Sequence, residues 1–220
     1  MAEGPRIVLF SVHRDAMEAA RHAFATRWPE AQVSNLLDDG LFRWVVEAGG
    51  VVPGMHDAFH TLTRYAVARG AQGIVYTCSA FREVIDGCRA MFPIPMLGPN
   101  TAMIDDALDA GSRLAVMATV GPTIPSFSAE LLEVAAARGR KVELVPVVVE
   151  GAFDALARGD AATHDRLVAE RAREIRDCDA VVLAQFTLAR AAPVVAAACP
   201  VPVFESPGAA VARMRALLAG

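Results

Sequence analysis

Several features are scarce in this sequence of 220 residues, and their scarcity excludes whole classes of protein. No block of lysine and arginine occurs and the formal net charge is -4, so the basic surface that nucleic acid or an anionic membrane requires is missing. No apolar run has membrane-spanning length, and the run Ile7–Phe10 is too short for a secretory signal. We therefore expect no nucleic acid and no membrane among the partners.

Cysteine and closely spaced glycines are scarce as well. The four cysteines, Cys78, Cys88, Cys178 and Cys199, form no CxxC pair and lack the spacing of zinc ligands. A zinc site and a disulfide framework are both poorly supported, so we expect reduced thiols in a cytoplasmic protein. No GxGxxG turn occurs, which disfavours a nucleotide-binding or flavin-binding protein.

Apolar residues, in contrast, make up 54% of the chain, and they are arranged in short runs that alternate with amphipathic segments. The runs are RIVLFSV, AQVSNLL, GIVYTCS, IPMLGP, RLAVMATV, KVELVPVVV, AVVLAQF and VPVFESP. The main amphipathic stretches between them cover residues 15–27, 55–69, 101–110, 129–138 and 164–176. This alternation predicts an α/β fold, with nearly continuous apolar strands that form doubly wound, mostly parallel sheets.

The chain also resembles itself at an offset of 107 positions. Arg6 to Leu9 then falls on Arg113 to Val116, and Gly73 to Tyr76 falls on Ala180 to Leu183. Several apolar runs agree on nearly one offset, which indicates an internal duplication. We therefore expect two similar α/β halves related by a pseudo-twofold axis, one formed by residues 1–98 plus 201–220 and the other by 99–200.

The same offset places Cys78 opposite Gln185, each directly after an apolar strand. Ligands of open α/β sheets bind outside the carboxyl ends of the strands. Two such halves facing one another would present Cys78 and Gln185 to a shared cleft, so we expect the active site there.

The motifs at these positions resemble the aspartate/glutamate racemase superfamily, which also contains hydantoin racemases, maleate isomerases and arylmalonate decarboxylases. The resemblance covers nearly the whole chain, in SVH, NLLDDGL, TCSAF, PIPMLGPNTAM, ATVGPTIPS, VVLAQFTLA and CPVPVFESPGAAV. It implies two pseudo-symmetric halves that each supply a catalytic residue, an isomerase that works without pyridoxal phosphate or metal, and a homodimer.

One departure from the family pattern affects the expected chemistry. Racemases of this family carry a cysteine in each half, and the two thiols exchange a proton on opposite faces of the α-carbon. Here the second position is Gln185, whose carboxamide exchanges no proton near neutral pH but can donate a hydrogen bond to an enolate oxygen. Cys178 and Cys199 precede their strands, which places them near the wrong edge of the sheet.

Cys78 itself admits two interpretations. A free cysteine is often only a small buried apolar residue. We favour a catalytic thiol, because Cys78 stands beside an expected helix N-terminus, where free N–H groups lower a thiol pKa. Its neighbours Thr77 and Ser79 are candidates to bind a substrate carboxylate, although either hydroxyl would also serve as a helix cap.

Further candidate substrate-binding residues follow other strands. The resemblance implies that Thr119 and Thr123 bind the carboxylate, whereas capping alone would account for Thr123. Thr187, just beyond Gln185, is a similar candidate or an ordinary helix start. Ser11 and His13 follow the first strand, and His13 is a candidate proton donor or an exposed loop residue without a role.

Other polar residues are weaker candidates. His56 and His60 stand four residues apart, but Asp57 replaces the glutamate of a HExxH motif and a third ligand is missing, so we expect no metal. Four more residues are accounted for by turns, caps or solvation, namely Asp38, Asp39, Asn100 and Glu205.

Two hypotheses of function follow. The first is a cofactor-independent enzyme that transfers a proton at the carbon alpha to a carboxylate of a small amino acid or dicarboxylate through Cys78 alone, with Gln185 supplying hydrogen bonds. A single thiol also permits decarboxylation, or cis-trans isomerisation through a thiol adduct. The second hypothesis is a catalytically silent protein that binds carboxylates.

Overall fold

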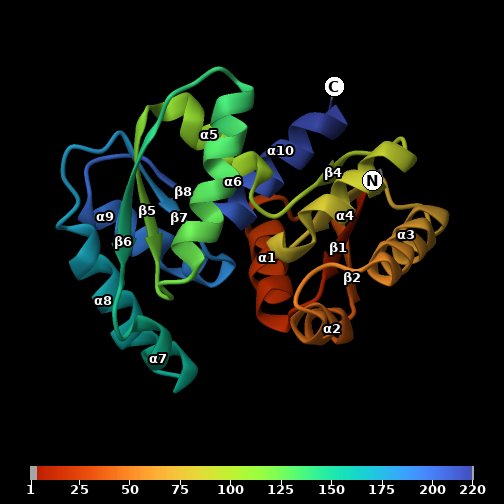
Figure 1. The fold of residues 1–220 in the computed structure, drawn as a ribbon, viewed down its shortest axis with the longest axis horizontal. Helices are drawn as coiled ribbons and strands as arrows, with labels where there is room; N and C mark the ends of the chain where they lie inside the picture. The colour runs from red at the N-terminus through yellow and green to blue at the C-terminus, as the bar shows by residue number, and fades with distance from the viewer. Residues whose placement is uncertain (1–3, 220) are drawn as a thin grey trace. The chain divides into compact units, whose positions relative to one another are not determined.

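The computed structural model describes residues 4–219, which divide into two compact units (Figure 1). Unit 1 takes in the chain up to Ala102 and again from Ala210, and unit 2 spans Met103–Ala209. Each unit contains one four-stranded parallel sheet.

Sheet A of unit 1 has the strand order β2-β1-β3-β4. Its strands are β1 (Arg6–Ser11), β2 (Gln32–Leu37), β3 (Gly73–Tyr76) and β4 (Met96–Leu97). The helices of unit 1 are α1 (Arg14–Arg27), α2 (Gly40–Ala48), α3 (Pro53–Ala68), the 3-10 turn η1 (Ser79–Phe81), α4 (Arg82–Met91) and most of α10 (Ser206–Ala219). Because every strand is parallel to its neighbours, all carboxyl ends of sheet A lie along one edge.

The two faces of sheet A carry alternate residues of its central strands. Phe10 and Tyr76 point to the face that α3 and α4 cover, where they join Phe59 and Phe81 in one buried aromatic cluster. The opposite face is so close to α10 that a Cβ on Gly73 would lie 2.5 Å from the sulfur of Met214. A larger residue at the start of β3 would therefore require the Met214 side chain to move.

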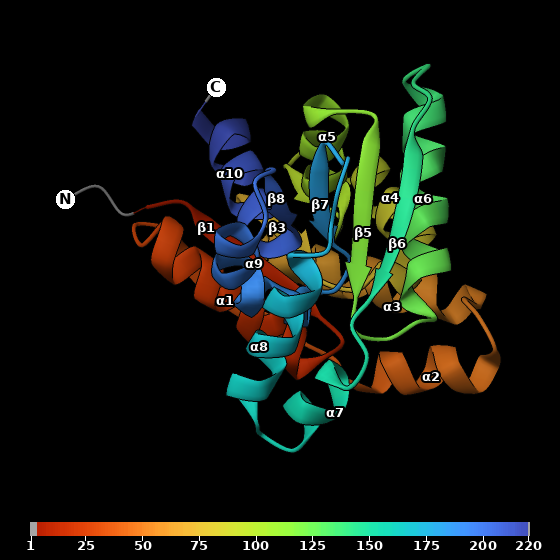
Figure 2. The same cartoon turned by 90° about the vertical axis from the view of Figure 1, so that its left-hand side faces the viewer.

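Sheet B of unit 2 repeats this arrangement with the order β6-β5-β7-β8, and Figure 2 shows β5, β6 and β7 side by side. Its strands are β5 (Arg113–Ala118), β6 (Glu143–Val148), β7 (Ala180–Leu183) and β8 (Val203–Glu205). The helices are most of α5 (Thr101–Ala110), α6 (Thr123–Ala137), α7 (Ala152–Ala157), α8 (Ala161–Ala172), the 3-10 segment η2 (Phe186–Ala191) and α9 (Ala192–Ala198).

Sheet B is also covered on both faces. Leu114 and Val116 pack with α5 and α6, whereas Met117 and Leu183 pack with α7, α8 and α9 (Figure 1). Two separate apolar clusters result, one on each side of the sheet. The expected α/β fold with doubly covered parallel sheets is confirmed.

The internal duplication is visible in the positions of the central strands. β1 and β5 begin at Arg6 and Arg113, and β3 and β7 begin at Gly73 and Ala180, so both pairs keep the offset of 107 positions. The two sheets have the same strand order, and a 3-10 segment follows β3 and β7 alike. Two similar halves are therefore confirmed.

The boundaries between the halves differ from those expected at 1–98 plus 201–220 and 99–200. Strand β8, which had been assigned to the first half, pairs with β7 in sheet B. The two units change over within helices, because α5 begins in unit 1 and continues into unit 2, and α10 does the reverse. The sequence of a short apolar run next to a boundary does not indicate which sheet the run joins. For this reason β8 was assigned to the wrong half.

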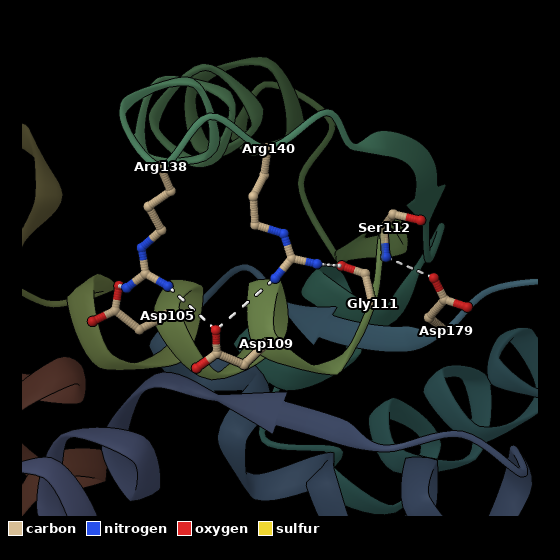
Figure 3. Close-up of polar contacts among 7 residues, drawn as sticks. All are labelled: Asp105, Asp109, Gly111, Ser112, Arg138, Arg140 and Asp179. Carbon is tan, nitrogen blue, oxygen red and sulfur yellow. Dashed lines mark hydrogen bonds and ion pairs between the residues drawn. The ribbon is translucent and has the colours of Figure 1, made fainter.

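A polar network ties together the amino edge of sheet B, opposite to the edge where Gln185 lies (Figure 3). The carboxylate of Asp179, just before β7, accepts hydrogen bonds from the backbone N–H groups of Ser112 and Arg113 at 2.7 and 2.8 Å. These bonds hold the pKa of Asp179 below its ordinary value. Arg140 donates to the carbonyl of Gly111, so the start of β5 is fastened from two sides.

Arg138 strengthens the same edge through α5. Its guanidinium pairs with Asp105 and Asp109, which joins the end of α6 to α5 (Figure 3). The network holds the sheet in place and lies away from the strand ends that carry the candidate site. Among residues 4–219, no helix combines the length and the apolar character needed to cross a lipid bilayer.

Candidate functional site

The carboxyl edge of sheet A brings Ser11 and Thr77 together. β1 and β3 are adjacent, and the backbone N–H of Thr77 extends their ladder by donating to the carbonyl of Phe10 at 3.1 Å. The Thr77 hydroxyl donates to the Ser11 hydroxyl at 2.9 Å, and the two residues are 5% and 0% exposed. These two predicted substrate-binding hydroxyls are thus paired with one another beneath the surface, where they hold the ends of the strands together.

Cys78 follows this pair and remains half-buried. It has extended backbone geometry, with φ -132° and ψ 119°, and it immediately precedes η1. Burial raises the pKa of the Cys78 thiol, and a hydrogen bond from the backbone of Ala80 opposes that rise without cancelling it. A thiol that keeps its proton near neutral pH results.

The raised pKa differs from the lowered one expected from a helix N-terminus. The element after Cys78 is a three-residue 3-10 turn, and α4 begins only at Arg82. Few aligned backbone dipoles therefore act on the sulfur, so its burial decides the direction of the shift.

Ser79 and His13 also lie at the carboxyl edge of sheet A. Ser79 is exposed as the first residue of η1, so its hydroxyl is accessible to a ligand. His13 is exposed immediately before α1, and its ring meets Phe42 edge-on with 4.7 Å between ring centroids. Both positions are compatible with a binding role.

The carboxyl edge of sheet B brings Thr119 and Gln185 into direct contact. The side-chain oxygen Oε1 of Gln185 accepts two hydrogen bonds from Thr119, at 2.6 Å from the backbone N–H and 3.0 Å from the hydroxyl. A backbone N–H can only donate, so the atom that it meets must be the amide oxygen. The amide nitrogen Nε2 is consequently the part of Gln185 that is left to donate.

Gln185 occupies the position in its half that Cys78 occupies in the other half. Its φ of -139° and ψ of 138° describe the same extended geometry, it also precedes a 3-10 segment, and it is also half-buried. The two halves therefore offer equivalent places to a thiol and to a carboxamide.

Thr123 and Thr187 lie at the same edge of sheet B. Thr123 is half-buried at the first position of α6, and its backbone N–H donates to the carbonyl of Val120 at 3.0 Å. Thr187 is half-buried within η2. Neither hydroxyl has a hydrogen-bond partner among the described residues 4–219, so both remain able to bind a ligand.

The weaker candidates have structural roles. Asp38 accepts a hydrogen bond from the backbone of Gly40 at 3.1 Å at the start of α2, next to an exposed Asp39. Glu205 accepts one from the backbone of Gly208 at 2.8 Å, so it caps α10. Asn100 is buried just before α5.

The histidine pair of α3 does not resemble a metal site. The rings of His56 and His60 have centroids 6.3 Å apart, and Nε2 of His60 is buried without a partner within residues 4–219. In that described part of the chain, no group of three or more His, Cys, Asp or Glu side chains is placed to hold a metal ion.

The contact between Thr119 and Gln185 was not foreseen from the sequence, although the offset that revealed the duplication contained a signal. It aligns Val12 with Thr119 and Cys78 with Gln185, so two neighbouring positions differ between the halves together. Thr119 and Gln185 are both polar, whereas Val12 and Cys78 are not, and both positions lie just beyond the ends of adjacent strands. Such a paired difference indicates a side-chain hydrogen bond.

Comparison with solved structures shows the same fold in several enzymes. Allantoin racemase from Klebsiella pneumoniae is 19% identical with a TM-score of 0.71, and the match covers 98% of this chain and 88% of that one. An aspartate racemase homologue from Pyrococcus horikoshii is 14% identical with a TM-score of 0.70, covering 98% and 99%. Unliganded arylmalonate decarboxylase is 20% identical with a TM-score of 0.65, covering 97% and 92%.

None of the curated proteins compared with this chain matches it. A family model described as Asp/Glu/Hydantoin racemase matches residues 50–214, a range that includes Cys78, Thr119 and Gln185. The family expected from the motifs is confirmed, and the chain belongs to the Asp/Glu/Hydantoin racemase family.

Proposed function

We propose that this protein is a cofactor-independent enzyme that transfers a proton at the carbon alpha to a carboxylate of a small amino acid or dicarboxylate, with Cys78 as its only proton carrier. The observation that carries the proposal is the replacement of the second thiol position by Gln185, whose amide oxygen accepts two hydrogen bonds from Thr119. An amide in this state neither takes up nor releases a proton near neutral pH.

The two halves then have different tasks. Cys78 exchanges the proton on one face of the α-carbon, and Nε2 of Gln185 donates a hydrogen bond to the oxygen on which negative charge develops. The residues proposed to bind the substrate carboxylate are those with accessible hydroxyls, Ser79, Thr123 and Thr187.

The protonation state of Cys78 favours one form of this chemistry. Because burial raises the pKa of its thiol, Cys78 is an acid at neutral pH rather than a base. Such a thiol suits the protonation of a carbanion formed by loss of carbon dioxide. The electron pair of the broken C–C bond stays on the α-carbon and takes the proton from sulfur, and solvent then reprotonates the thiolate. Decarboxylation is therefore the second candidate.

The test is proton exchange in deuterated water. Each enantiomer of aspartate and glutamate is incubated with the enzyme, and loss of the α-hydrogen is followed by NMR. In parallel, substituted malonates are assayed for release of carbon dioxide and for stereospecific uptake of deuterium. We expect exchange from one enantiomer only, or one-sided deuteration of a decarboxylated product. Equal exchange from both enantiomers would refute a single proton carrier.

Two cysteine variants make the assay specific. Cys78→Ala should lower the rate by about 100- to 10,000-fold, the usual contribution of a general acid or base. Cys199→Ala is the matched control, since Cys199 is buried before β8, at the other edge of sheet B. If no substrate reacts and Cys78→Ala still binds dicarboxylates as well as wild type does, the protein is a carboxylate binder instead.

A third variant restores the family pattern. Gln185→Cys places a second thiol at the equivalent position of sheet B, so exchange from both enantiomers is expected. Gln185→Ala serves as its control, because it removes the amide without adding a proton carrier. A homodimer in the cytoplasm stays a prediction, and light scattering of the purified protein tests the oligomeric state.

A further inference from the structure

Thr119 has two hydrogen-bond donors, and both point at the same acceptor. Its backbone N–H and its hydroxyl meet Oε1 of Gln185 at 2.6 and 3.0 Å. A threonine hydroxyl carries one hydrogen, so this hydroxyl has none left for a substrate carboxylate. Thr119 is also only 9% exposed. The substrate-binding role that the sequence suggested for Thr119 therefore conflicts with its contacts.

The strand arrangement explains why this contact forms. β5 and β7 are neighbours, with Met117 opposite Leu183, and the ladder continues when the N–H of Ala184 donates to the carbonyl of Met117 at 2.9 Å. Gln185 directly follows Ala184, and Thr119 lies two residues beyond Met117. Two adjacent buried strands therefore fix the distance between them, so the pair does not depend on a long loop.

The duplication gives an independent observation. At the equivalent place in sheet A, Val12 stands where Thr119 stands and Cys78 stands where Gln185 stands. Valine has nearly the shape of threonine but carries no hydroxyl, so it offers no side-chain donor to position 78. The side-chain donor is present in the half that contains the amide and absent from the half that contains the thiol.

We propose that Thr119 is a positioning residue, which holds the amide oxygen of Gln185 so that Nε2 is presented to the substrate as a hydrogen-bond donor. The identity of the acceptor, an oxygen of a carboxylate substrate, rests on the proposed function. An amide turned by 180° would present its oxygen instead, and two oxygens with partial negative charge repel one another. Thr119 thus determines which end of a symmetric-looking side chain meets the ligand.

The orientation is testable without any catalytic assay. The chain has three glutamines, so the side-chain NH₂ signals are few, and Gln185→Leu identifies the one from Gln185. We expect the heteronuclear NOE of the Gln185 side-chain NH₂ group to be high in wild type, because the group is held rigidly. In Thr119→Val, which keeps the shape and the backbone bond to Gln185 but loses the bond from the hydroxyl, it should fall toward the value of Gln32, an exposed residue of β2. Thr119→Ser should restore it.

Titration with succinate tests the donor role. The Nε2 protons of Gln185 should shift downfield as this dicarboxylate binds, and Thr119→Val should weaken binding by about three- to tenfold, the effect of one hydrogen bond. Thr119→Ser should bring the affinity back. Gln185→Glu keeps an acceptor for Thr119 but has no donor and adds a negative charge, so succinate binding should be lost.

The outcomes separate this inference from the proposed function. A Gln185 amide that stays equally rigid in Thr119→Val overturns the positioning role, whatever the catalytic assays give. Succinate that shifts signals around Cys78 while the Gln185 NH₂ signals stay unmoved overturns the donor role. A wild-type protein that shows the expected amide behaviour but exchanges no α-proton contradicts the proposed function and leaves the positioning of Gln185 supported.

Discussion

Alkylation of Cys78 in the folded protein should be slow near neutral pH and should accelerate only in alkaline solution. The thiolate is the nucleophile, and burial raises the pKa of the Cys78 thiol above its ordinary value despite the hydrogen bond from Ala80. An ordinary cysteine has a pKa of about 8.5, so about 10% of it is ionised at pH 7.5. The ionised fraction of Cys78 must be smaller, and its alkylation rate is reduced with it.

The assay follows iodoacetamide labelling of individual cysteine-containing peptides by mass spectrometry between about pH 6 and pH 10. The chain unfolded in urea supplies the reference for an unperturbed thiol. Cys88 is fully buried, so it is the internal control and should react only when the protein unfolds. The half-maximal rate for native Cys78 is expected at a higher pH than in the unfolded chain.

A half-maximal rate near pH 7 would refute this reasoning, since it would mean that a nearby positive field outweighs burial. Cys78 would then be able to act as a base, and the argument for decarboxylation as the second candidate would be lost. The raised pKa also affects the free energy of unfolding, which should fall as the pH rises. A raised folded pKa means that the contribution of Cys78 is fully present below its unfolded pKa and is lost as the pH rises through the folded value.

Three further predictions concern unit 2. Gly111→Ala should lower the stability by about 1–3 kcal/mol, because a Cβ there would lie 2.1 Å from Cβ of Asp179; an unchanged melting temperature would contradict this. Asp179 has a lowered pKa, so wild type should lose stability as the pH falls below about 4. Asp179→Asn should lose less stability over the same fall in pH. Urea midpoints that fall equally in the two proteins would contradict a role of the Asp179 carboxylate. Leu183→Ala should lower the free energy of unfolding in urea by about 2–5 kcal/mol, because this side chain of β7 is 0% exposed beneath the helices that cover the sheet. A loss well under about 1 kcal/mol would show that the cluster relaxes around the cavity.

The fold was predictable because its signals are periodic and repeated. The eight apolar runs contain the eight strands of the described residues, and the offset of 107 positions is kept by β1 with β5 and by β3 with β7. Buried parallel strands leave little freedom in composition, so such runs are visible without any alignment.

The elements that were missed are short or begin with residues typical of turns. α7 and α9 have six and seven residues, which is too few for a helical period to emerge. α10 begins with Ser206 and Pro207 and contains Gly208, a sequence typical of a loop, yet Glu205 caps it. Pro at the first turn and a side-chain acceptor before it favour a helix start, and that combination was the available signal.

The candidate site was predictable in its positions and less so in its contacts. Topology alone places residues 78 and 185 at strand ends, because β3 and β7 are central parallel strands. Which hydroxyls remain accessible depends on side-chain geometry, and two of those expected to bind substrate, Ser11 and Thr77, are bonded to each other. The direction of the Cys78 pKa was also mistaken, since the length of the following helical segment was not visible in the sequence.

The two halves carry different functional groups at equivalent backbone positions. Cys78 and Gln185 share extended geometry before a 3-10 segment, so the fold supplies the same place twice and leaves the choice of functional group to the side chains. A thiol needs no partner to exchange a proton, whereas an amide has a donor end and an acceptor end, and a bond to its oxygen fixes which end faces a ligand. In the proposed mechanism, Gln185 therefore works together with the donors of Thr119, which the sheet places beside it. Membership of the family alone would assign two proton carriers, and this pair of residues argues for one.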